Sequence, residues 1–73
     1  MKSIKTSNGF EFFFNKEDAL ANAIGKVVMP ATYSNYYDKA ILNDTNTVYA
    51  EGTDEYAIAN GECDYYGYVV VKH

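Results

Sequence analysis

A turn dipeptide followed by a run of phenylalanines constrains the fold of this chain more than any other feature. Asn8-Gly9 is the dipeptide that best tolerates the two positive φ angles of a type I′ turn, so residues 2–14 are predicted to form a β-hairpin. All four phenylalanines of the chain lie on the second arm. Three of them, Phe10, Phe12 and Phe14, alternate and would share one face. That aromatic face must be buried against another element.

The residues after the hairpin carry the signature of a helix start. Asn15 is a favourable N-cap, and Glu17 and Asp18 fall in the first turn, where carboxylates complement the helix dipole. A helix that begins at Lys16 and is ended by Pro30 would place its apolar residues on one stripe, which can cover the hairpin. That stripe consists of Ala19, Leu20, Ala23, Ile24, Val27 and Val28.

The remaining residues are predicted to add a short helix and three strands. Residues 31–42 fit helical spacing, which favours a short helix, although their aromatic content also fits a strand. Strand-like runs follow at residues 47–51, 55–60 and 64–72, and the turn residues between them predict an antiparallel meander. Within the last run, Gly67 could mark a β-bulge.

These elements predict one α+β domain that spans residues 1–73. Its architecture would be a small antiparallel sheet, made of the N-terminal β-hairpin and a C-terminal three-stranded meander, with one or two helices packed on one face. A chain of 73 residues buries only a thin core, so we expect a net stability of only a few kcal/mol.

Charge is distributed unevenly along the chain. The net charge is −4, from ten acids and six bases, and every base is a lysine. Residues 1–37 carry a net charge of +1, whereas residues 38–73 carry −5. An acidic field repels phosphate backbones, and without arginine there is no bidentate phosphate contact. Direct nucleic-acid binding is therefore disfavoured, and a basic protein is the expected partner.

Candidate catalytic and metal-binding residues are scarce. The only histidine is His73 at the end of the chain, so a Ser-His-Asp or Cys-His arrangement is not expected. Cys63 is the only cysteine, which excludes an internal disulfide and indicates a reduced thiol, with a reactive thiol as the alternative. A calcium loop beginning at Asp44 fails because Val48 and Tyr49 stand where an oxygen ligand and a glycine are required. We therefore expect no enzymatic activity, no metal and no cofactor.

Tyrosines and acids interleave in the second half of the chain. All eight tyrosines lie at or after position 33, and a domain of this size cannot bury them all. Tyrosine is favoured at binding hot spots, and carboxylates steer basic partners. The alternative is that these are ordinary core and strand residues with solvated acids around them. The candidate partner-binding residues are Tyr36, Tyr37, Asp38, Glu51, Asp54, Glu55, Glu62, Asp64, Tyr65 and Tyr66.

In its size, its hairpin-helix opening and its acid-tyrosine groups between Tyr36 and Tyr66, the chain resembles the small acidic inhibitor proteins of phages and mobile elements, of the anti-CRISPR and anti-restriction type. Some of these proteins imitate DNA by presenting carboxylates where phosphates would lie. The resemblance implies a non-enzymatic inhibitor that docks on a basic, nucleic-acid-handling host protein such as a CRISPR-Cas effector.

The first residues lack the apolar run of a signal peptide, and no stretch approaches the roughly 20 apolar residues of a membrane span. We therefore expect a cytoplasmic protein, in the host cytoplasm if it is phage-encoded. Two other functions stay open. One is a structural or interaction module, either a homodimer or a complex subunit, that uses exposed tyrosines and an edge strand at residues 64–72. The other is an enzyme that works through carboxylates alone.

Overall fold

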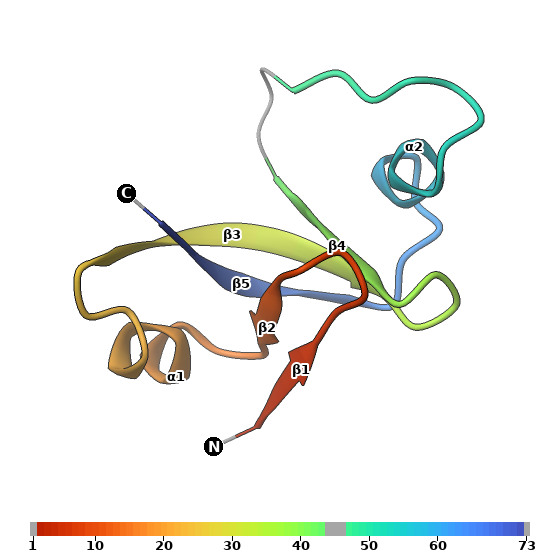
Figure 1. Ribbon diagram of the computed structural model, residues 1–73. Coiled ribbons are helices and arrows are strands. Elements are labelled where there is room, and N and C mark those ends of the chain that lie inside the picture. The colour runs from red at the N-terminus through yellow and green to blue at the C-terminus, as the bar shows by residue number, and fades with distance from the viewer. Residues whose placement is uncertain (1, 44–46, 73) are drawn as a thin grey trace.

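The C-terminal strand lies at the centre of the sheet (Figure 1). The computed structural model describes residues 2–43 and 47–72 and contains one antiparallel five-stranded sheet with two short helices, which confirms the α+β prediction. The strand order is β1-β2-β5-β3-β4. The elements are β1 (Ser3–Lys5), β2 (Glu11–Phe13), α1 (Lys16–Ala21), β3 (Lys26–Ser34), β4 (Lys39–Leu42), α2 (Asp54–Ala59) and β5 (Tyr65–Lys72).

The long pair β3 and β5 forms the spine of this sheet. Its register runs without interruption from Lys26 opposite Lys72 to Tyr33 opposite Tyr65. A bulge at Gly67 is therefore wrong. The glycine is required for a different reason, because a Cβ atom there would lie 2.2 Å from the Phe13 carbonyl oxygen and 2.7 Å from the Phe12 ring. Gly67 thus allows β2 and its phenylalanines to pack directly onto β5.

The N-terminal hairpin is confirmed, but its turn differs from the predicted type I′. The Thr6 N–H donates to the Phe10 carbonyl (2.8 Å), and the Gly9 N–H donates to the Thr6 carbonyl (3.2 Å), so the loop holds three residues. Gly9 has a φ of +92°, whereas Asn8 does not adopt positive φ. This geometry matches a turn followed by a left-handed glycine.

The Asn8 side chain explains why the turn takes this form. Its Nδ2 donates to the Ala40 carbonyl (2.7 Å), and its Oδ1 accepts from the Ala40 N–H (3.2 Å). The carboxamide therefore pairs with β4 as a strand residue would. Nearby, the Ser7 N–H and hydroxyl both donate to the Asp38 carbonyl. These bonds join the hairpin to the far edge of the sheet, which curls the sheet onto itself.

The core lies on the inner face of this curled sheet. Phe12 is fully buried there, and its ring centroid lies 5.4 Å from that of Tyr33. The predicted aromatic face is thus buried mainly by the sheet itself, and not by the helix, while Phe14 stays 39% exposed. The buried cluster consists of Phe12, Ala31, Tyr33, Ala40 and Val69, and its half-buried neighbours are Ile4, Phe10, Met29, Leu42 and Val71.

Helix α1 begins as predicted and ends early. The Asn15 side chain accepts from the Asp18 N–H (2.9 Å), which confirms the N-cap, but the helix stops at Asn22. The turn into β3 follows, with Gly25 at a φ of +72°, because the β-branched residues after it pair with β5. The predicted helix up to Pro30 is therefore wrong, and two residues of its supposed stripe, Leu20 and Ile24, are 55% and 91% exposed.

Pro30 lies within β3 instead of ending a helix. Its carbonyl accepts from the Asn43 N–H (3.0 Å), and the nitrogen and carbonyl of a strand residue point to the same side. The proline nitrogen, which carries no hydrogen, therefore points toward the β4 side, where β4 has already ended at Leu42. No ladder hydrogen bond to β5 is lost, and this is the setting in which a strand tolerates proline.

The predicted helix at residues 31–42 and two of the three predicted meander strands are also wrong. Residues 31–42 form the end of β3, a turn at residues 35–38 and the strand β4, so the alternative of a strand holds. Residues 47–51 form no strand, and residues 55–60 lie in and after α2. Thr53 caps that helix, because its hydroxyl accepts from the Tyr56 N–H (3.1 Å). Of the three predicted meander strands, only the last exists.

Candidate functional site

Three segments that are distant in sequence meet at one end of the sheet. They are the turn at residues 35–38, the segment 61–66 that leads into β5, and the start of α2 (Figure 1). The Asn35 N–H donates to the Asp64 carboxylate (2.6 Å), which joins the first two segments. The Lys39 ammonium contacts Asp54 at 2.8 Å, which holds α2 against β4. We call this region the acidic end, formed by Tyr36, Tyr37, Asp38, Asp54, Glu55, Glu62, Asp64 and Tyr66.

The acidic end contains eight of the ten residues that the sequence nominated. Tyr65 lies on the other face of β5, where its ring stacks on Tyr33 at 6.4 Å and meets Phe14 edge to face at 5.1 Å. Tyr65 therefore packs against the core margin. Glu51 is exposed in the loop before α2. No contact in the described part of the chain ties it to the other nine.

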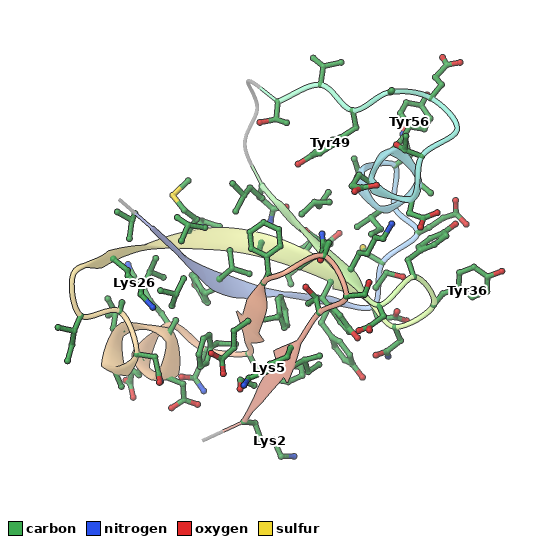
Figure 2. All side chains as sticks on the ribbon, viewed as in Figure 1. Lys2, Lys5, Lys26, Tyr36, Tyr49 and Tyr56 are labelled. Atoms are coloured by element: carbon green, nitrogen blue, oxygen red, sulfur yellow. The ribbon has the colours of Figure 1, made fainter. Side chains whose placement is uncertain are left out.

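The tyrosines of the acidic end are partly exposed, as predicted. Tyr36 is 86% exposed and Tyr66 is 73% exposed, whereas Tyr33 in the core is 4% exposed. Figure 2 shows Tyr36 projecting from the turn away from the rest of the chain. The Tyr36 and Tyr37 rings meet edge to face, with centroids 4.8 Å apart and planes at 88°. The exposed ring of Tyr36 therefore lies at nearly a right angle to the half-buried ring of Tyr37.

Three of the acids hold the fold together as well as carrying charge. Asp38 accepts from the Tyr33 hydroxyl (2.8 Å), Asp54 pairs with Lys39, and Asp64 accepts from the backbone of Asn35. Because of burial first and the hydrogen bond to Asp38 second, the pKa of Tyr33 is raised to about 12. Sequence reasoning did not anticipate these internal roles, since each partner lies in another element or across a turn.

The two glutamates of the acidic end, Glu55 and Glu62, differ from these three aspartates in their surroundings. Glu55 is half-buried in the first turn of α2, and Glu62 is exposed on the segment before β5. The pKa of the Tyr37 hydroxyl is raised, chiefly by desolvation and next by the negative charge of Glu62. The lysine of this region, Lys39, is committed to Asp54. The acidic end therefore presents uncompensated negative charge beside phenol rings.

A shallow depression of about 270 Å³ lies within the acidic end. It is lined by Ser34, Tyr36 and Tyr37 and by the segment 61–64, and Ser34 is buried. Its polar groups include the carboxylates of Glu62 and Asp64, and no lysine lines it. This combination of aromatic and carboxylate groups suits a cationic ligand.

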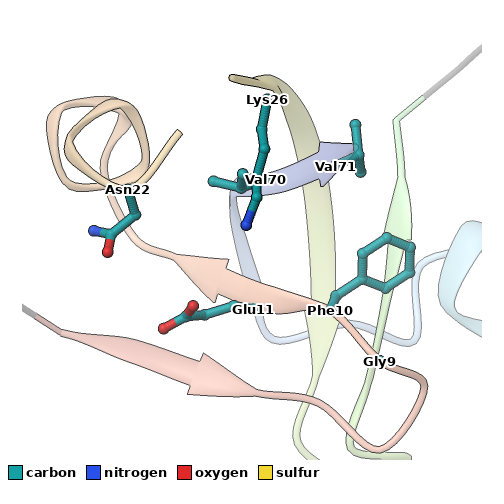
Figure 3. Close-up of a pocket in the computed structure, with 7 residues that line it drawn as sticks. All are labelled: Gly9, Phe10, Glu11, Asn22, Lys26, Val70 and Val71. Carbon is teal, nitrogen blue, oxygen red and sulfur yellow. The ribbon is translucent and has the colours of Figure 1, made fainter. Parts of the chain in front are cut away.

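The opposite side of the molecule has a different character. Lys2, Lys5 and Lys26 lie away from Tyr36 (Figure 2). The larger depression of about 430 Å³ lies there, between α1 and the hairpin, and its charged residues are one base, Lys26, and one acid, Glu11 (Figure 3). It contains none of the nominated residues, and it shows no accumulation of one charge.

The described residues form no metal-binding cluster, and Cys63 is a free thiol. No group of three or more His, Cys, Asp or Glu side chains is arranged to hold a metal ion in residues 2–43 and 47–72. The beginning of the rejected calcium loop, at residues 44–46, lies outside the described residues. Cys63 is half-buried, with its Sγ 3.7 Å from the Tyr66 hydroxyl, and this contact is the largest cause of the raised pKa of Tyr66. Among the helices described, none has the length and apolarity that crossing a membrane requires.

The edge-strand interface predicted at residues 64–72 is wrong. This segment is β5, which pairs with β2 on one side and β3 on the other. The edges of the sheet are β1 and β4. The free side of β4 is already occupied, because Asn8 pairs with Ala40. Strand addition at residues 64–72 therefore cannot build a dimer.

No family model matches the chain, and comparisons with curated proteins and with solved structures return no significant match.

Proposed function

We propose that this protein is a non-enzymatic binding protein whose acidic end docks on a basic surface of a protein that handles nucleic acid, and that it inhibits that protein by occupying the surface. The observation that supports this proposal most is the convergence of acids from three segments around the exposed ring of Tyr36, with one lysine, Lys39, which is already paired. Such a surface attracts a positively charged partner and offers it an aromatic anchor.

The two-sided distribution of charge gives this docking a direction. The first half of the chain carries a net charge of +1 and the second half −5, and five of the seven acids of the second half belong to the acidic end. A basic partner would therefore be oriented toward the acidic end during approach. Surfaces that bind nucleic acid are the most basic surfaces that proteins commonly present, so a nucleic-acid-handling protein in the cytoplasm is the partner class we infer.

Binding to a panel of purified nucleic-acid-binding proteins tests this proposal. The panel contains CRISPR-Cas effectors, restriction enzymes and a histone tetramer, with serum albumin as the acidic control. We expect at least one basic protein to bind at about 50 mM NaCl, to bind at least tenfold more weakly at about 300 mM, and to be competed by duplex DNA.

Two results would contradict the proposal. One is the absence of binding to every basic protein at low salt. The other is binding that neither salt nor duplex DNA weakens, because an interface of that kind would not depend on the acidic end.

A further inference from the structure

The depression at the acidic end has the shape of a corner. The edge-to-face packing of Tyr36 and Tyr37, at 88°, places two ring surfaces around one volume of about 270 Å³. Glu62 also lines this depression, and its charge is one of the causes that raise the pKa of the Tyr37 hydroxyl. We call the group formed by Tyr36, Tyr37 and Glu62 the aromatic corner. Tyr36 is 86% exposed, so its ring is available to a ligand without rearrangement of the core.

The charge of the corner selects among ligand classes. Glu62 and Asp64 both line the depression and no lysine does, while the Lys39 ammonium contacts Asp54 at 2.8 Å. An anion would be repelled, and a purely apolar ligand would leave the carboxylates without compensation. A hydrated metal ion would find too few free ligands, because the Asp64 carboxylate already accepts from the Asn35 N–H. An organic cation satisfies both the rings and the carboxylate.

Among organic cations, the guanidinium group fits this corner better than an ammonium group. It is planar and weakly hydrated, so it stacks on an exposed aromatic ring while its N–H groups donate to a carboxylate beside that ring. An ammonium is a compact, strongly hydrated charge, and it loses more hydration on entering a half-open depression.

We propose that the aromatic corner formed by Tyr36, Tyr37 and Glu62 binds a single arginine side chain of the partner. This proposal rests on the proposed function and names the group through which the acidic end recognises its partner. The guanidinium lies against the Tyr36 ring and donates to the Glu62 carboxylate. Asp64 also lines the depression but accepts from the Asn35 N–H, and the acids outside the depression act only at longer range.

Titration of ¹⁵N-labelled protein with short peptides tests this assignment without the natural partner. The probes are Ac-Gly-Arg-Gly-NH₂, the lysine peptide Ac-Gly-Lys-Gly-NH₂ and the uncharged citrulline peptide Ac-Gly-Cit-Gly-NH₂. We expect the arginine peptide at millimolar concentration to shift the amides of residues 34–37 and 61–64 in a saturable manner. The lysine peptide should bind several-fold more weakly, and the citrulline peptide should produce no saturable shift.

Exposed residues inside and outside the corner provide matched variants. Tyr36→Ala and Glu62→Gln should each weaken the arginine peptide about three- to fivefold, whereas Tyr36→Phe should retain binding because the ring remains. The controls are Tyr66→Ala and Glu51→Gln, which remove the same groups at exposed positions outside the depression and should change the affinity less than twofold. Circular dichroism confirms that all five variants fold.

Three results would overturn the aromatic corner. The first is equal binding of the lysine and arginine peptides. The second is that the arginine peptide shifts the amides of all the acids, and that these shifts persist in Tyr36→Ala. The third is that neither cationic peptide produces a saturable shift. Each can occur while basic proteins still bind the chain in a salt-sensitive manner, in which case the proposed function stands and only the corner is wrong. The failure of the proposed function is different, because there no basic protein binds at all.

Discussion

The hairpin side and the acidic end of this molecule use polar side chains in opposite ways. On the hairpin side, Asn8 directs both its donor and its acceptor to the backbone of Ala40, which is 1% exposed. At the acidic end, Glu62 and Tyr36 are exposed on the surface. Polar side chains thus stabilise the fold on the hairpin side and are available to a partner at the acidic end. Substitutions should therefore reduce stability on the hairpin side and binding at the acidic end.

Gly67→Ala should have the largest effect, because it attacks the packing of β2 on β5. The nearest atom to the new Cβ would be a backbone oxygen, that of Phe13 at 2.2 Å, which cannot swing away as a side chain can. We expect a destabilisation of about 3 kcal/mol or more, at the upper end of overpacking effects, measured by urea unfolding.

Gly9→Ala is the matched control for this glycine. It meets no atom within 4 Å but has a φ of +92°, so it should cost only about 1 kcal/mol from backbone strain. If the two alanine variants prove equally stable, β2 does not pack on β5 as described.

Asn8→Ala should have the next largest effect. It removes both bonds to Ala40 and leaves a buried N–H and a buried carbonyl without partners, which costs about 2–3 kcal/mol. Asn8→Asp keeps the acceptor alone, so its stability should lie between that of Asn8→Ala and that of the wild type.

Ser7→Ala removes an exposed hydrogen bond that water can replace, so its unfolding midpoint should stay close to that of the wild type. Loss of stability in Ser7→Ala equal to that in Asn8→Ala would show that Asn8 does not close the sheet.

High pH should destabilise the protein through Tyr33. Its pKa is about 12 in the folded protein, against about 10 for an unperturbed tyrosine, so the folded state retains a proton that the unfolded state loses. The stabilising contribution is complete below pH 10 and disappears as the pH rises from about 10 to about 12. Urea midpoints across this range should fall more steeply in the wild type than in Tyr33→Phe. Identical slopes would mean that the Tyr33 hydroxyl is not buried beside Asp38 as described.

Glu55→Lys with Glu62→Lys should change stability least, within about 0.5 kcal/mol, because Glu55 acts on Lys39, and Glu62 on the Tyr37 hydroxyl, only near the surface, where water screens the charges. The three remaining acids of the acidic end, Asp38, Asp54 and Asp64, are different because each has an internal partner. Reversal of Asp54 alone should cost more stability than the pair of glutamates, as thermal unfolding would reveal. The opposite order would remove the distinction between acids that hold the fold and acids that are available to a partner.

The parts of the fold that sequence predicted correctly are local. Asn15 caps its helix and the hairpin forms, because both depend on residues a few positions apart. The central position of β5 could not be predicted, because it depends on pairs such as Val27–Val71 and Phe12–Val69, which are 44 and 57 positions apart in the chain. Helix α2 had a local signal that was missed, namely Thr53 as an N-cap before two acids.

The sequence indicated the candidate site only through the composition of the second half of the chain. The interleaving of acids and tyrosines identified the second half of the chain, and folding brings eight of the ten nominated residues to one end. The sequence could not distinguish the acids that bond to other parts of the fold from the acids that are available to a partner. Asp64 bonds to Asn35 across 29 positions, and Lys39 meets Asp54 across 15, so their roles follow from tertiary structure alone.

The most direct test of the account places equal charge changes at the two ends of the molecule. Glu55→Lys with Glu62→Lys changes the acidic end, and Glu11→Lys with Glu17→Lys changes the hairpin and α1, so both variants have the same net charge. Affinity for a basic protein that binds the wild type should fall at least tenfold in the first variant and less than threefold in the second. Equal losses in both would show that total charge, and not the acidic end, determines binding.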